Sequence, residues 1–93
     1  MSDNTVYVID GRRYARNREI VEHNVHVYSS YQNLIAAFKP FLEVSNKEVH
    51  MNGKNEMLQV RIYYPSNQFL TKYKFDIYEK KIDNFFPSTT EHI

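Results

Sequence analysis

The clearest hydrophobic pattern along the chain is helical and covers residues 29–42 (SSYQNLIAAFKPFL). Its apolar residues recur three or four positions apart, which places them on one face of an α-helix; they are Tyr31, Leu34, Ile35, Phe38, Phe41 and Leu42. Ser29 or Ser30 can cap the first turn with its hydroxyl. Pro40 has no N–H and clashes with the carbonyl four residues back, so we expect the helix either to end near Lys39 or to kink.

The segment before the helix alternates between apolar and polar residues with the period of two that is typical of strands. Residues 5–9 (TVYVI) form a first strand, and the Asp10-Gly11 pair predicts a hairpin turn, because Gly accepts the positive φ of tight turns. Residues 12–16 would then return as a second strand. After a break at residues 17–19, Ile20–Tyr28 is a third strand.

The third strand has two distinct faces. Its valines share one of them, and we expect that face to point inward because β-branched residues favour a packed strand; the two sets are Val21, His23, Val25 and Val27 against Glu22, Asn24, His26 and Tyr28. A short helix over residues 14–23 is the alternative, although the apolar residues there are spaced poorly for a helix.

The segment after the helix predicts three more strands. Residues 48–52 form a short one, and Asn52-Gly53 predicts a tight hairpin turn to Met57–Tyr64. A turn at residues 65–67 leads to a last strand over residues 69–78, because Pro65 cannot continue a central ladder. The predicted inward residues of these two strands are Leu58, Val60, Ile62 and Tyr64, then Phe69, Thr71, Tyr73, Phe75 and Ile77.

These elements predict one α+β domain over residues 1–93, with residues 1–4 and 88–93 flexible. The order is βββαβββ, giving a mostly antiparallel sheet of about five or six strands with one helix (about 30–41) packed on one face. Phe85 and Phe86 are expected to dock on the domain. The helix should pack on the inward residues Val21, Val25, Val27, Leu58, Val60, Ile62, Phe75 and Ile77.

Composition supports a folded protein, since 42% of the residues are hydrophobic and 15% are aromatic. The chain has no Cys, which excludes disulfides and thiolate metal sites and suits a reducing compartment. Its N-terminus lacks the features of a signal peptide, and no apolar run approaches the length of a membrane span. We therefore expect a cytoplasmic protein.

The inventory of reactive residues predicts a protein that is not an enzyme. There is no G-x-S-x-G elbow, no Cys nucleophile and no H-E-x-x-H metal motif. Gly11 and Gly53 are better explained by turns than by a phosphate loop. His23 and His26 are three apart on a strand and point to opposite faces, although either one meeting His50 across strands is an open alternative. We predict no catalytic residues, no metal and no cofactor.

The charges are balanced overall, with twelve Lys and Arg against eleven Asp and Glu, but the basic residues are clustered. One cluster surrounds Tyr14 and another lies near Tyr78. Together with exposed tyrosines they give the candidate partner-binding residues Arg12, Arg13, Arg16, Arg18, Tyr63, Lys72, Lys74 and Tyr78. Lys72 and Lys74 should share one exposed face. Such a pattern suits an acidic protein surface or nucleic acid, and also a plain solvated sheet whose Lys residues prevent aggregation.

Four tyrosines, Tyr7, Tyr28, Tyr63 and Tyr78, fall opposite the apolar sets of their strands, which is typical of a sheet face that contacts something. The resulting hypothesis is a small non-enzymatic protein that binds and occludes another macromolecule, most simply a protein, as phage-encoded inhibitors of similar size do. The alternatives are a nucleic-acid-binding domain and a homo-oligomeric subunit that pairs through a sheet edge or the tyrosine face.

Overall fold

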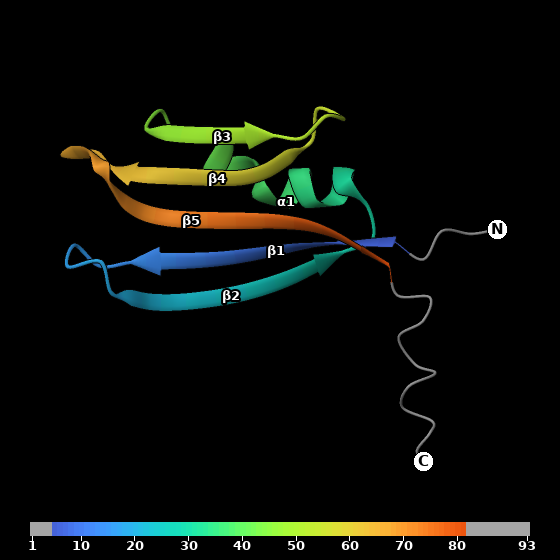
Figure 1. Cartoon of the computed structure of the whole chain (residues 1–93), viewed down its shortest axis with the longest axis horizontal. Helices are drawn as coiled ribbons and strands as arrows, with labels where there is room; N and C mark the ends of the chain where they lie inside the picture. The colour runs from blue at the N-terminus through green and yellow to red at the C-terminus, as the bar shows by residue number, and fades with distance from the viewer. Residues whose placement is uncertain (1–4, 82–93) are drawn as a thin grey trace, which may run out of the picture.

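The computed structural model describes residues 5–81, which form five strands and one helix. They are β1 (Thr5–Tyr14), β2 (Ile20–Tyr28), α1 (Tyr31–Leu42), β3 (Lys47–Met51), β4 (Met57–Tyr64) and β5 (Asn67–Lys81). The strands make one antiparallel sheet in the order β2-β1-β5-β4-β3, with β2 and β3 at its edges and α1 on one face (Figure 1). The α+β class is thus confirmed, with the element order ββαβββ.

Two sequence expectations concern residues outside the described range. They are the flexibility of residues 1–4 and 88–93 and the docking of Phe85 and Phe86. Within that range, no helix is long and apolar enough to cross a membrane.

The predicted hairpin turn at Asp10-Gly11 is wrong, because both residues continue strand β1. Gly11 does not have a positive φ. A Cβ at Gly11 would lie 2.9 Å from Cε1 of Phe75, so the glycine provides room for that ring on the strand beneath the core. The chain turns instead between β1 and β2, where Arg18 has a φ of 72° and its N–H donates to the carbonyl of Ala15. The alternative of a short helix over residues 14–23 is therefore also wrong.

The helix begins as its sequence predicts and ends later than Pro40. Ser30 is the N-cap, and its Oγ accepts a hydrogen bond of 3.1 Å from the N–H of Asn33. Pro40 lies inside α1, which continues to Leu42. The proline lies on the exposed side of the helix, where its ring meets solvent and the missing N–H costs one hydrogen bond.

The core lies between α1 and the sheet face that it covers, called here the inner face. It consists of Ile9, Leu34, Phe38, Met57, Val60, Ile62, Phe75 and Ile77, each at most 8% exposed. Tyr31 ties the start of the helix to β4, since its hydroxyl accepts a 2.8 Å hydrogen bond from the N–H of Met57. Aromatic rings fill the far end, with the centroids of Phe38 and Phe75 4.6 Å apart in an edge-to-face arrangement.

The valines of β2 do not face the core, contrary to expectation. Val21, Val25 and Val27 are 48%, 52% and 60% exposed. The register pairs the buried Ile9 with His26, so the polar alternate residues of β2 lie on the inner face and the valines on the opposite one. Because successive side chains point to opposite faces, the pairing with β1 decides the orientation of the whole strand.

Three more sequence predictions differ from the structure, because the chain is locally irregular at these positions. The hairpin turn predicted at Asn52-Gly53 does connect β3 to β4, and the N–H of Asn55 donates to the carbonyl of Asn52, but Asn55 and not Gly53 takes the positive φ, at 65°. Leu58 is 47% exposed, whereas the neighbouring Met57 is buried in its place. Register shifts between β4 and β5 turn Phe69 outward, where it is 89% exposed. Each irregularity breaks the period-two rule on which the predicted faces depended.

Candidate functional site

The face of the sheet opposite α1, called here the outer face, has no helix over it among the described residues. The strand registers align its side chains in rows that cross the sheet. One row places Arg12 of β1 directly opposite Lys74 of β5, and Lys74 directly opposite Arg61 of β4. We call these three residues the basic row. His23 extends it on β2, and Glu48 ends it on β3.

The basic row is unfavourable for folding on its own. Like charges directly opposite one another on neighbouring strands destabilise a sheet. Arg12 has only a 3.8 Å contact with Asp10, and within the described residues Lys74 and Arg61 form no ion pair. The Nε of Arg61 is buried without a hydrogen-bond partner in that part of the chain. An anionic group from outside would relieve all three cations.

An acidic pair lies in the next row along the strands. Asp10 and Asp76 are directly opposite each other on β1 and β5. His23 contacts the Asp10 carboxylate at 2.7 Å, and Gln59 donates a 2.9 Å hydrogen bond to Asp76. These contacts hold the carboxylates in the sheet beside the basic row. The charge on the outer face therefore changes from positive to negative over two residues along β1 and β5.

An apolar patch borders the acidic pair, with Val25 directly opposite Asp10. It consists of Val8, Val25, Val27 and Tyr78, with Val8 directly opposite both Val27 and Tyr78. Val25, Val27 and Tyr78 are each about half exposed. Apolar side chains that gather on a rim of charges are typical of surfaces that bind a protein.

A shallow hollow lies at the opposite end of the outer face. It is lined by Tyr14, Arg18, Arg61, Phe69, Thr71 and Lys74. Two of its cations belong to the basic row, and the third, Arg18, comes from the β1–β2 turn. Phe69 presents an almost fully exposed ring beside them. The hollow can thus receive an anionic group and a flat apolar group together.

Five of the eight residues predicted from the sequence belong to this outer surface. Arg12 and Lys74 are in the basic row, Arg18 lines the hollow and Tyr78 is in the apolar patch. Tyr63 flanks the row on β4 and donates a 2.8 Å hydrogen bond to Glu48. That bond to a carboxylate, with burial second, raises the pKa of Tyr63, so the phenol is a neutral donor at physiological pH.

The other three predicted residues are engaged elsewhere. Arg13 binds Glu22 at 2.9 Å on the inner side of the sheet. Arg16 stacks over the ring of Tyr64 at 4.3 Å, and Lys72 lies 5.5 Å from the same ring. Lys72 falls at the register shift between β4 and β5, so it does not share the face of Lys74 as expected. The contacts among Arg16, Tyr64 and Lys72 connect the end of the β1–β2 hairpin to the end of the β4–β5 hairpin.

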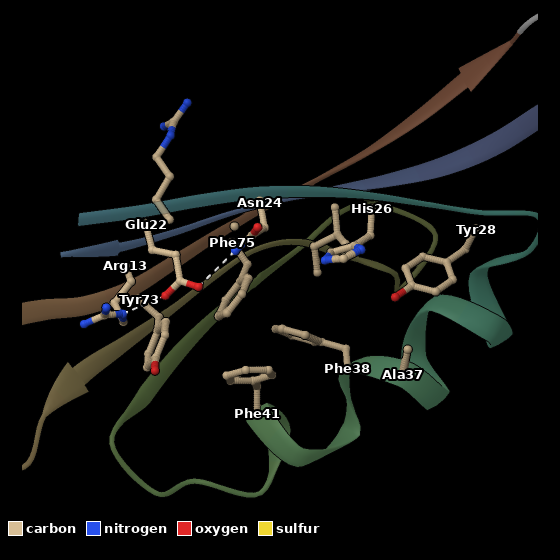
Figure 2. Close-up of a pocket in the computed structure, with 13 residues that line it drawn as sticks. Arg13, Glu22, Asn24, His26, Tyr28, Ala37, Phe38, Phe41, Tyr73 and Phe75 are labelled. Carbon is tan, nitrogen blue, oxygen red and sulfur yellow. Dashed lines mark hydrogen bonds and ion pairs between the residues drawn. The ribbon is translucent and has the colours of Figure 1, made fainter. Parts of the chain in front are cut away.

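A second candidate site is a cleft of about 310 Å³ between α1 and the inner face of β2. Figure 2 shows the rings of Phe38 and Phe41 on the helix side of it, and polar side chains of β2 on the sheet side together with the ring of Phe75. Glu22 borders the cleft, and hydrogen bonds from Arg13 and then Asn24 lower its pKa. Such a cleft can hold a small amphipathic group, but Arg13 and Asn24 already bind its carboxylate.

The histidines are dispersed rather than clustered. His23 lies on the outer face of β2 and His26 on its inner face, while His50 lies on β3 at the other edge of the sheet. The open alternative of His50 meeting either of the other two is therefore excluded. Among residues 5–81, no group of three His, Asp or Glu side chains could hold a metal ion.

Sequence reasoning missed Arg61, the acidic pair and the valines of the apolar patch. Arg61 stands alone in the sequence, away from both basic clusters, and only the strand pairing brings it beside Lys74. Val25 and Val27 were assigned to the core because the valines of β2 form a regular apolar face. The resulting outer face has separate basic, acidic and apolar zones. No protein-family model, curated protein or solved structure matches this chain.

Proposed function

We propose that this protein is a non-enzymatic binding protein that covers a surface of another protein with the outer face of its sheet. The observation that carries the proposal is the basic row of Arg12, Lys74 and Arg61, which repel one another in the free protein. A complementary partner presents carboxylates to this row and an apolar surface to Val25, Val27 and Tyr78. By occluding that surface, the protein inhibits or modulates its partner, in the manner of small phage-encoded inhibitors.

The alternation of charge favours a protein partner over nucleic acid. Asp10 and Asp76 lie one row away from the cations, and they would repel a phosphate backbone laid across the sheet. A protein surface can place cations opposite this pair and carboxylates opposite the basic row. The chain is free of cysteine, which suits an interaction in the cytoplasm.

The experiment compares two identical substitutions on the same strand and face. Lys74→Gln removes the centre of the basic row, whereas Lys80→Gln removes a cation opposite Val6, outside the row. Protein retained from a host extract on the wild type and the Lys80→Gln variant, and lost from the Lys74→Gln variant, supports the proposal. Equal retention on all three, or none on the wild type, overturns it.

Nucleic acid remains the second candidate because of the hollow. Arg18, Arg61 and Lys74 there surround the exposed ring of Phe69, which suits a phosphate and a stacked base. This alternative predicts a gel shift with single-stranded oligonucleotides at low salt that weakens steeply as salt rises. A Phe69→Ala variant would weaken that shift, while leaving capture of a protein partner through the apolar patch unchanged.

A further inference from the structure

Strand β2 is an open edge of unusual character. It is nine residues long and exposed along nearly its whole length, and no described element lies beside its outer edge. It contains neither Pro nor Lys, the residues that commonly protect edges, and Ile20, Val21, Val25 and Val27 are exposed on it. The opposite edge, β3, is five residues long, carries Lys47 and has an irregular register. Of the two sheet edges within residues 5–81, β2 alone offers a continuous template for another strand.

We propose that β2 pairs antiparallel with the β2 of a second copy of this chain, about a twofold axis through Asn24. Asn24 is the middle residue of Ile20–Tyr28, so this register alone pairs all nine residues. It also keeps the inner faces of both copies on one side, as the alternation of side chains requires. The inference does not depend on the proposed function, because strand pairing uses the backbone groups at the edge of the sheet whether or not another protein binds the outer face.

The cross-strand pairs in this register are complementary. On the outer face, Val21 lies opposite Val27 of the partner subunit, and the reciprocal pair forms by symmetry. On the inner face, Glu22 lies opposite His26 of the partner subunit. Such apolar and polar pairs are those that stabilise neighbouring strands. A register shifted by two residues centres on His23 or Val25, loses two residues of overlap and separates Glu22 from His26.

The dimer has a functional consequence, because a twofold axis perpendicular to the sheet puts both outer faces on the same side. The two basic rows then belong to one surface with ten strands beneath it. On the inner side, the two clefts bordered by Glu22 and His26 adjoin across the axis. The second copy thus extends both candidate sites of the first.

A single cysteine tests the register, since the native chain has none. Directly opposed residues in an antiparallel pair have Cα atoms about 4.5–5.5 Å apart, which a disulfide can span. The Asn24→Cys variant is expected to form a covalent dimer under mild oxidation. The control His50→Cys, on the other edge, is expected to stay monomeric under the same conditions. Equal crosslinking of both variants, or of neither, overturns the proposed pairing.

Light scattering on the unmodified protein provides the second measurement, with a mass of twice 11.2 kDa expected. His26→Glu places carboxylates opposite Glu22 in both symmetric pairs, and we expect it to weaken the dimer by on the order of tenfold or more. His26→Lys should retain the dimer, because it places a cation opposite Glu22. A wild type that is monomeric up to millimolar concentration overturns the proposal, as does an identical effect of both substitutions.

Discussion

The two faces of this sheet obey different physical demands, although the same strands supply both. The inner face buries Ile9, Val60 and Phe75 under the helix, where close packing restricts the size and shape of the side chains. The outer face places like charges opposite one another and leaves valines exposed, which packing alone does not favour. Stability is therefore concentrated on the inner face, and the outer face tolerates features that packing does not favour.

The inner face is itself divided. Under α1 it is dry and aromatic, whereas along β2 it is polar, with Glu22 and Asn24 beside the cleft of Figure 2. The helix covers the central strands, and the edge strand extends past it. A strand that no helix covers can be polar inside and apolar outside without losing its place in the sheet.

The largest effect should come from removing the centre of the core. Leu34 is fully buried, so Leu34→Ala is expected to lower the free energy of unfolding by about 3–5 kcal/mol, through lost burial and the cavity left behind. Val27→Ala, on the exposed outer face, should change it by no more than about 0.5 kcal/mol. Chemical denaturation measures both, and similar losses for the two variants would contradict the division between the faces.

Gly11 should be the next most sensitive position. A Cβ there meets Phe75 at 2.9 Å, and this ring is held in the core, so Gly11→Ala is expected to cost about 1–3 kcal/mol. Gly53 is the matched control, because a Cβ there meets nothing within 4 Å and its φ is not positive. Gly53→Ala should be neutral or stabilising by up to about 1 kcal/mol. Thermal unfolding distinguishes the two, and a neutral Gly11→Ala would show that β1 can move away from β5.

A substitution in the basic row should raise the free energy of unfolding, whereas the substitutions at Leu34 and Gly11 lower it. Lys74→Gln removes the middle of three like charges and is expected to raise the free energy of unfolding by about 0.2–1 kcal/mol, more at low salt than at high salt. Lys80→Gln should have no such effect. If Lys74→Gln instead lowers stability at every salt concentration, the row contributes to folding and the contrast between the faces fails.

The smallest effect concerns the ion pair of Arg13 and Glu22 at the edge of the inner face. Its hydrogen bond lowers the pKa of Glu22 below the ordinary 4.5, so the pair stabilises the fold above that value. The stabilisation is lost as pH falls through the lowered pKa. Urea midpoints of the wild type should exceed those of Glu22→Gln at neutral pH and converge with them in acid. A constant difference at all pH values would show that charge plays no part.

Much of the fold could be predicted because local signals were strong. The helix followed from its apolar period and the cap at Ser30, and β4 and the core half of β5 followed from alternation around Val60 and Phe75. The errors arose where a local preference met a tertiary constraint. Asp10-Gly11 has turn chemistry, but the space needed by Phe75 keeps Gly11 in a strand. About half of the candidate site could be predicted, because those residues are clustered along the sequence. Arg61 could not be predicted, because it stands apart from both basic clusters.

The sequence by itself determined the helix α1 and the two alternating sets of side chains on β2, because both follow from periodicity and local preferences. It could not determine which face of β2 turns inward, since alternation is identical in either orientation. The tertiary structure decided this when β1 placed Ile9 under the helix and paired it with His26. The same pairing put the valines outside and assembled Arg12, Lys74 and Arg61 from three strands, since register brings distant residues together.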